Sequence, residues 1–327
     1  MILHLDGVDS PSLPLFNFLG RIYFPDDNHN LYQNFIYYRK IPKGVNVMGF
    51  PPQQQSKPGI ESLMIPRPIF DNPNYKPAGK LINKVALITG GDSGIGRAVA
   101  VAFAKEGADI AISYLNEHSD AKETEFYVKK YGRSCITISG DIGHEQHCQQ
   151  AVMQTIHQFG RIDILVNNAG VLYIRNSLLD VDSNQRTSTF HTNVFSQFIL
   201  TKAALPYMNS GSSIINTTSL SAYHGDQDAI DYAASKGAIV SFTRSLSSSL
   251  APQGIRVNAV APGPIWTPLI PSSLPPEWLA TFGDHVPMKR AGQPFELAPA
   301  YVFLASEDAS YISGQILHVN GGEIING

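Results

Sequence analysis

Tyr232 and Lys236 are the pair whose residue types and spacing point most directly to chemistry, in the sequence YAASK. The surrounding residues are predicted to be helical, and an i,i+4 spacing places both side chains on one face of a helix, with Cβ atoms about 6 Å apart. An ammonium group beside a phenol lowers the pKa of the phenol from about 10 toward neutrality, as an acid–base catalyst requires. Because the spacing is common, a half-buried tyrosine beside a solvated lysine is the competing interpretation.

Ser219 ends the apolar run SIINTTS, thirteen residues before Tyr232. The run is predicted to be a strand of a doubly wound sheet, in which ligands bind at the carboxyl ends of the strands. Ser219 and Tyr232 are therefore expected to converge on one ligand.

The sequence TGGDSGIG (89–96) follows the first predicted strand and leads into a helical segment. Gly90, Gly94 and Gly96 allow a tight turn, a close approach of the backbone to a pyrophosphate, and close packing of helix on strand. The helix N-terminus adds unpaired N–H groups and partial positive charge, which favour phosphate. The spacing is G-x-x-x-G-x-G and glycine loops also occur as plain turns, but the position between strand and helix favours dinucleotide binding.

The elements that position these residues alternate regularly from Lys84 onward. Short apolar runs rich in β-branched residues predict strands at 84–89, 108–114, 134–139, 163–170, 213–218, 255–263 and 316–322. Segments with helical periodicity occur at 94–107, 121–132, 145–160, 184–208, 230–251 and 295–305. Uninterrupted apolar strands alternating with helices indicate a parallel sheet covered on both faces. The sequence thus predicts the α/β class, with one Rossmann-type doubly wound sheet formed by residues 81–327.

The first 80 residues differ in composition and contain 11 of the 22 prolines. Because proline lacks the backbone N–H and restricts the residue before it, residues 48–80 are predicted to form an extended Pro-rich arm. This arm is expected to lie on the folded domain or on a neighbouring subunit. Residues 1–47 are rich in aromatic side chains but show no period of 2 or 3.6 residues. We interpret them as disordered, or as an extension outside the functional protein that precedes a start at Met48.

Composition argues against several classes of protein. The net charge is −3 without a basic block, which argues against nucleic acid as a partner, and no apolar run reaches the roughly 18 residues that span a membrane. Cys135 and Cys148 are too few for a disulfide framework or a cysteine-based zinc site, and no metal site is expected. Asp6 and Asp9 stand where a secretory signal has basic residues. A cytoplasmic globular protein is expected.

Five motifs occur in the order found in the short-chain dehydrogenase/reductase family: TGGDSGIG, NNAG (167–170), Ser219, YAASK and APG (261–263). The resemblance covers about residues 80–327 and is closest to a subgroup of general-stress and glucose/ribitol-dehydrogenase-like oxidoreductases. Bacterial members of that subgroup also carry an arm similar to GFPPQQQSKPGIESLM (49–64). The resemblance implies an NAD(P)-dependent oxidoreductase that interconverts an alcohol, such as a polyol or a sugar, with its carbonyl compound.

The resemblance also implies roles for four catalytic residues. Tyr232 would be the general acid/base that exchanges a proton with the substrate oxygen, and Ser219 would hold that oxygen by a hydrogen bond. Lys236 would hold the nicotinamide ribose and lower the pKa of Tyr232. Asn193 would bind a water that relays protons from Lys236 to solvent, although taken alone it is an ordinary helix-surface amide.

Further residues are implied to surround the cofactor. Asn167 and Ala169 would stabilise the sheet and border the dinucleotide, whereas Asp141 would contact the adenine or, alternatively, cap the following helix. Residues 262–267 would close over the nicotinamide and the phosphates. The expected cofactor-binding residues are Gly90, Asp92, Ser93, Gly94, Ile95, Gly96, Tyr114, Leu115, Asn116, Asp141, Ile142, Asn168, Ala169, Gly170, Tyr232, Lys236, Pro262, Gly263, Ile265 and Thr267.

The choice between NAD and NADP depends on the charge beside the adenosine ribose. An acidic residue at the end of the second strand binds the 2′-hydroxyl of NAD, whereas an arginine accepts the 2′-phosphate of NADP. Tyr114, Leu115 and Asn116 carry neither charge. Because the carboxylate of Asp92 in the glycine loop disfavours a phosphate, NAD is favoured and NADP is the alternative.

Residues 262–290 contain seven prolines together with Trp266 and Trp278. A connection of this length predicts a lid over the substrate. The candidate pocket residues are Tyr173, Leu220, His224 and Trp266, although His224 has a competing interpretation as a solvated loop residue. A mixed polar and aromatic pocket suits a polyol, a sugar or a small aldehyde.

Two other functions remain open at this point. The chain could be a catalytically silent dinucleotide-binding sensor, or a structural protein whose N-terminal arm carries the function. The helices at 184–208 and 230–251 carry apolar residues on more than one side, which predicts subunit contacts. The resemblance also implies packing of these helices into dimers and tetramers, so a homotetramer is predicted. The candidate contact residues are Phe195, Phe198, Ile199, Leu205, Ile239, Val240, Phe242 and Leu246.

Overall fold

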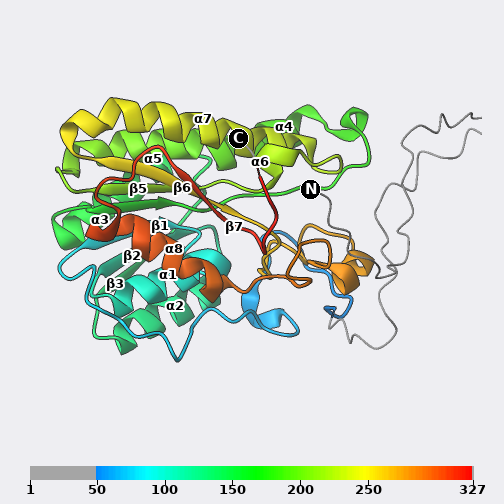
Figure 1. The fold of residues 1–327 in the computed structure, drawn as a ribbon, viewed down its shortest axis with the longest axis horizontal. Helices are drawn as coiled ribbons and strands as arrows, with labels where there is room; N and C mark the ends of the chain where they lie inside the picture. Colours follow the sequence, from blue (N-terminus) through cyan, green and yellow to red (C-terminus); the bar gives the residue numbers. More distant parts are fainter. Residues whose placement is uncertain (1–48, 326–327) are drawn as a thin grey trace, which may run out of the picture. The chain divides into compact units, whose positions relative to one another are not determined.

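Seven parallel strands form the centre of residues 49–325, the part of the chain that this computed structural model describes (Figure 1). The strands are β1 (Val85–Thr89), β2 (Asp109–Tyr114), β3 (Cys135–Ser139), β4 (Ile164–Asn167), β5 (Ser213–Thr217), β6 (Arg256–Pro262) and β7 (Ile316–Val319). Their order across the sheet is β3-β2-β1-β4-β5-β6-β7, so the strand order reverses between β1 and β4. The prediction of a doubly wound α/β sheet is confirmed.

Helices cover both faces of this sheet (Figure 1). One face carries α1 (Gly94–Lys105), α2 (His118–Lys130) and α8 (Pro294–Ala305), and the other carries α3 (Glu145–Phe159), α5 (Ser196–Ala204) and α7 (Ile230–Leu250). Successive residues of β1 alternate between the two cores, with Ile88 on the α1 side and Leu87 on the α3 side. Within residues 49–325, no helix is both long and apolar enough to cross a membrane.

The segment predicted as one helix at 184–208 is broken into shorter pieces. It consists of α4 (Ser183–Phe190), a π-helical turn (His191–Phe195), α5 and a 3₁₀ turn (Leu205–Tyr207). Asp182 begins α4, because its side chain accepts a hydrogen bond from the backbone N of Gln185 at 2.8 Å. Single π-turns inside helices frequently occur at functional sites, and this turn contains Asn193.

The strand predicted at 163–170 ends at Asn167, where the chain leaves the sheet. The Asn167 side chain is buried, and its Nδ2 donates to Oδ1 of Asn216 at 2.9 Å, which ties β4 to β5. Asn168 turns back toward β1, where its Nδ2 donates to the carbonyl of Thr89 at 3.1 Å. This turn opens the carboxyl edge of the sheet beside the glycine loop.

The Pro-rich residues 49–80 follow the surface of the sheet domain with one short 3₁₀ turn at Glu61–Leu63. Phe50 stacks on Trp266 with ring centroids 3.7 Å apart, and Met64 is buried in the same apolar cluster. The indole Nε1 of Trp266 donates to the carbonyl of Pro66 at 2.8 Å. The arm is therefore held against residues 266–282. The prediction for residues 1–47 lies outside the described residues.

Candidate active site

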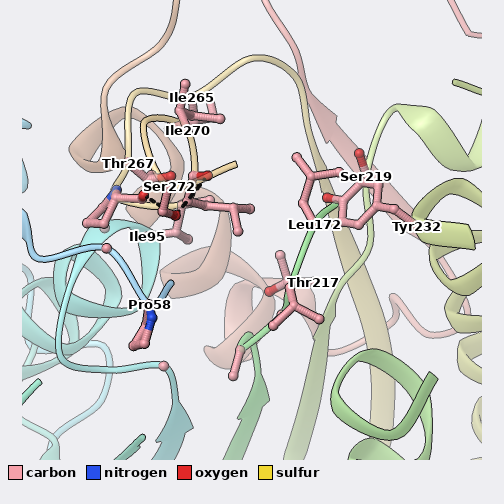
Figure 2. Close-up of a pocket in the computed structure, with 18 of the residues that line it drawn as sticks. Pro58, Ile95, Leu172, Thr217, Ser219, Tyr232, Ile265, Thr267, Ile270 and Ser272 are labelled. Carbon is pink, nitrogen blue, oxygen red and sulfur yellow. Dashed lines mark hydrogen bonds between the residues drawn. The ribbon is translucent and has the colours of Figure 1, made fainter. Parts of the chain in front are cut away.

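A cavity of about 630 Å³ lies at the carboxyl edge of the sheet. Its walls come from the residues that follow β1 to β6, from the segment 262–285, and from residues 57–59 of the arm. Figure 2 shows Ser219 and Tyr232 on one side of this cavity, and Pro58, Ile95 and Thr267 on the other. This is the edge at which doubly wound sheets bind their ligands.

Ser219, Tyr232 and Lys236 all line the cavity, as the sequence predicted. The Ser219 hydroxyl lies close enough to the Tyr232 phenol to lower its pKa. The ammonium Nζ of Lys236 donates to the carbonyl of Thr217 at 2.9 Å and lies 5.6 Å from the centroid of the Tyr232 ring. The end of β5 and the start of α7 thus bring together three of the four expected catalytic groups.

The electrostatic effect expected of Lys236 on Tyr232 is not found. Burial raises the pKa of Tyr232 to about 12, although the hydroxyl of Ser219 acts to lower it. Burial also lowers the pKa of Lys236 to about 8. Loss of hydration is the largest cause for Tyr232 and the one cause for Lys236, and the charge of Lys236 is not among the causes that act on Tyr232.

Asn193 does not line the cavity, because it is buried behind the loop that follows β4. Its Oδ1 accepts from the backbone N of Val171 at 2.8 Å, and its Nδ2 donates to the carbonyl of the same residue at 3.0 Å. A Cβ placed at Gly170 would lie 3.2 Å from Asn193 Oδ1 and 3.5 Å from Lys236 Nζ. Asn193 therefore belongs to the same cluster of side chains as Lys236, and its two hydrogen bonds with Val171 hold the loop after β4 in place.

The glycine loop has the conformation that its sequence predicts. Gly90 and Gly94 have φ angles of +62° and +51°, which residues with a Cβ rarely adopt. A Cβ at Gly96 would collide with the carbonyl oxygen of Gly90, so α1 can approach the loop only because Gly96 lacks one. Gly90 and Gly94 line the cavity together with Ser93 and Ile95, whereas Gly96 does not.

The other expected cofactor-binding residues, with one exception, also line the cavity. The exception is Asn116, whose backbone N is instead bonded to a carboxylate oxygen of Glu117 at 2.8 Å. Asp141 lines the cavity and accepts from the backbone N of Gly143 at 2.7 Å, whereas the N-cap position of α3 is taken by His144, whose side chain makes no capping hydrogen bond. The lining residues of this set are Asp92, Tyr114, Leu115, Asp141, Ile142, Asn168, Ala169, Gly170, Pro262, Gly263, Ile265 and Thr267.

Glu117 is a lining residue that the sequence analysis missed. It is nearly buried, as is Asp92, and both face the same end of the cavity. Burial, followed by the charge of Glu117, raises the pKa of Asp92 to about 7. The signal was present in the sequence, since Glu117 comes three residues after the end of β2.

Of the four candidate pocket residues, Tyr173, Leu220 and His224 line the cavity. The prediction for Trp266 is wrong, because its ring is fully buried between Phe50 of the arm and the rest of the segment. The other tryptophan of this segment, Trp278, lines the cavity instead. Sequence alone could not distinguish the two, because the arm that covers Trp266 lies some 200 residues earlier in the chain.

Glu61, from the arm, makes a contact at the first turn of α1 that no motif indicated. One carboxylate oxygen accepts from the backbone N of Gly94 at 2.6 Å, and the other accepts from Nη1 of Arg97 at 2.6 Å. Both side chains are fully buried. Burial raises the pKa of Glu61 to about 7, against the opposing effect of Arg97. The arm is thus bonded directly to the glycine loop.

Comparison with known sequences identifies relatives along most of the chain. A family model described as enoyl-(acyl carrier protein) reductase matches residues 90–323. General stress protein 39 of Bacillus subtilis is 56% identical over 84% of this chain and 96% of its own length. Glucose and ribitol dehydrogenase of Daucus carota is 53% identical over 85% of this chain and 98% of its own length.

Solved structures share the fold. A short-chain dehydrogenase from Burkholderia cenocepacia, in complex with NADP, aligns with a TM-score of 0.71 and 32% identity over 74% of this chain and 98% of its own. A 3-ketoacyl-(acyl-carrier-protein) reductase from Brucella melitensis, complexed with NADH, aligns with a TM-score of 0.68 and 33% identity over 74% and 98%. Together with the cluster of Ser219, Tyr232 and Lys236, these matches show that the chain is an enzyme of the short-chain dehydrogenase/reductase family.

Proposed function

We propose that this enzyme interconverts an alcohol and its carbonyl compound by hydride transfer with a nicotinamide dinucleotide, and that Tyr232 is its general acid/base. The observation that carries the proposal is the joint position of Ser219, Tyr232 and Lys236 on one wall of the 630 Å³ cavity, with the glycine loop on another. The names of two relatives, a dehydrogenase of glucose and ribitol and a reductase of 3-ketoacyl groups, support the same class of reaction.

The residues of the cavity fit a dinucleotide. Gly90 and Gly94 have positive φ angles, and the packing of Gly96 excludes a side chain, so the backbone can approach a pyrophosphate closely. The N-terminus of α1 adds a partial positive charge at this point. The proteins from Burkholderia cenocepacia and Brucella melitensis were solved with NADP and NADH, which supports a cofactor of this type here.

Tyr232 and Ser219, the two catalytic side chains at the substrate end of the cavity, have different roles. Tyr232, which has a pKa of about 12 and is protonated at physiological pH, donates its proton to the carbonyl oxygen during reduction. During oxidation it first releases that proton through Lys236 and then, as the phenolate, accepts the proton of the alcohol. Ser219 holds the substrate oxygen next to the phenol. When bound, the nicotinamide supplies or accepts the hydride.

Lys236 and Asn193 have supporting roles in this arrangement. Lys236 holds the ribose next to the nicotinamide and, with a pKa of about 8, can exchange protons near neutral pH. Asn193 fixes the loop at Gly170 and Val171 through paired backbone hydrogen bonds. In the proposed relay, protons pass from Tyr232 through Lys236 and a water held at Asn193 to solvent.

We propose NAD as the preferred cofactor. Asp92 and Glu117 face the end of the cavity beside Leu115, where the adenosine ribose would lie. A carboxylate accepts a hydrogen bond from the 2′-hydroxyl of NAD, but it repels the 2′-phosphate of NADP. The decisive measurement is kcat/KM with each dinucleotide and one substrate.

The proposed substrates are polyols, sugars and small aldehydes, because Tyr173, His224 and Trp278 give the cavity a polar and aromatic lining. A screen of these compounds with NAD, NADP and their reduced forms, followed by nicotinamide absorbance, tests the proposal. Turnover of at least one pair that is lost in Tyr232→Phe is expected. Turnover that persists in the Tyr232→Phe variant would contradict the assigned mechanism.

Two further proposals concern the whole protein. Phe195 and Phe198 are about half exposed on the α5 side, and Phe198 packs on Phe242 of α7 with centroids 4.1 Å apart, which supports a homotetramer formed through these helices. Ile239 and Val240 do not contribute, because they point into the core. Cys135 and Cys148 are buried and unpaired, in agreement with a reducing compartment such as the cytoplasm.

A further inference from the structure

Lys57 is a cation of the arm that lies in the wall of the active-site cavity. Its Nζ donates to the carbonyl of Ser272 at 2.9 Å and lies 4.6 Å from the centroid of the Tyr173 ring. An ammonium group has three N–H donors, and among residues 49–325 the Ser272 carbonyl is the one protein acceptor of Lys57. The arm therefore brings a partly satisfied positive charge to a site that the motifs of the family do not include.

Lys57 makes no ion pair within residues 49–325, and neither does its charged neighbour, Arg175. By contrast, Arg67 of the arm and Arg97, which contacts the arm, each form an ion pair with Glu123. Burial and the charge of Arg175 both lower the pKa of Lys57. Although exposed in part, Lys57 thus has a charged neighbour of the same sign and no anion beside it among the described residues.

The position of Lys57 relative to the catalytic residues follows from the loop after β4. Gly170 lies against Lys236, because a Cβ there would be 3.5 Å from its Nζ. Tyr173, which contacts Lys57, comes three residues later, and three residues span at most about 11 Å. The lid closes the same region, since Ser273 Oγ donates to the carbonyl of Leu172 at 3.0 Å. Lys57 therefore lies on the same loop and lid region as the catalytic end of the cavity, within reach of the far end of a substrate bound there.

We propose that Lys57 binds a carboxylate or phosphate of the substrate, at the end of the molecule away from the reacting carbonyl. This rests on the proposed function and narrows its substrate class to anionic aldehydes, ketones or sugars. The ammonium would form a charge-assisted hydrogen bond with the anionic oxygens. The arm then selects the substrate, while the sheet domain carries the reaction.

The test compares matched substrates that differ in the distal group: succinic semialdehyde against butanal, and phosphorylated glyceraldehyde against glyceraldehyde. The ratio of kcat/KM for the anionic and neutral partners is expected to fall by about 10- to 100-fold in Lys57→Met, as for the loss of a hydrogen bond to a charged group. Lys57→Arg should keep most of the ratio. Lys76→Met is the matched control, because Lys76 is an exposed lysine of the same arm.

A ratio that is the same in wild type and Lys57→Met would overturn the proposal. A rise in the Kd of NADH with an unchanged ratio would also overturn it, since the anion held by Lys57 would then belong to the cofactor. If no carbonyl compound is turned over, the proposed function fails separately, and calorimetric titration still tests the subsite. Wild type should bind butanoate more tightly than butanamide, and Lys57→Met should lose that difference; equal binding in both proteins contradicts the proposal.

Discussion

Burial dominates the properties of individual residues in the cavity. In Tyr232, Lys236 and Asp92 the pKa is shifted in the direction that favours the neutral form of the side chain, and loss of hydration is the largest cause in all three. A neutral phenol suits the donation of a proton to a carbonyl oxygen. A neutral carboxyl group at the ribose end lessens the repulsion of a phosphate, so the two ends of the cavity respond to pH in different ways.

Tyr232→Phe removes the hydroxyl group and keeps the packing of the ring. Turnover is expected to fall by at least ~10²-fold, the lower end of general acid–base catalysis. The Kd of the dinucleotide, measured by fluorescence titration, should change little, because the ring remains in place. Turnover within a few-fold of wild type would rule out Tyr232 as the acid/base.

Asp92 gives the cofactor preference a pH dependence. The pKa of this group is raised to about 7, so it is mostly protonated below that pH and carries a negative charge above it. The ratio of kcat/KM for NADP to that for NAD should therefore fall as the pH rises through about 7. In Asp92→Asn this part of the fall should disappear, while the ionisation of the 2′-phosphate itself remains in both proteins. Identical pH profiles for the two proteins would contradict the placement of Asp92 at the ribose.

At the scale of elements, the central strands could be predicted from the sequence because they are largely apolar runs buried on both faces, as VALIT in β1 shows, whereas the edge strands β3 and β7 are only partly buried. The positions of the glycine loop, Ser219 and Tyr232 could be predicted as well, because each of them depends on elements that are close to it in the sequence. The contributions of Glu61 and Lys57 could not be predicted. Their partners, Gly94 and Ser272, are remote in the chain, and no periodicity links an irregular arm to the surface on which it lies.

The arm and α1 are coupled through Glu61. Glu61→Ala leaves Arg97 without one buried partner and the backbone N of Gly94 without its acceptor. The free energy of unfolding is expected to fall by about 3–5 kcal/mol, as for a broken buried ion pair, and the Kd of the dinucleotide should rise. Leu63→Ala is the control, since Leu63 is exposed in the same 3₁₀ turn and should cost less than about 0.5 kcal/mol. Chemical denaturation of both variants provides the measurement, and equal effects would contradict the coupling.

At the scale of the whole molecule, Phe195 of the π-helical turn and Phe198 of α5 are about half-exposed aromatic side chains that the proposed tetramer would cover. Sedimentation equilibrium at micromolar concentration is expected to give a mass near four times 35.7 kDa. Phe198→Asp should shift the mass to that of smaller species, because a carboxylate replaces the ring that packs on Phe242 and that would contact a neighbouring subunit in the proposed tetramer. A wild-type mass of one chain would refute the tetramer.

The long reach of the arm has a consequence for the order in which the protein is built. Lys57 bonds to a carbonyl 215 residues later, and the carbonyl of Pro66 bonds to an indole 200 residues later. During synthesis the arm leaves the ribosome well before these partners exist, and contacts between such remote residues form late in folding. The last wall of the cavity is therefore added only to a chain that is nearly complete, which keeps unfinished polypeptides from acquiring a finished substrate site.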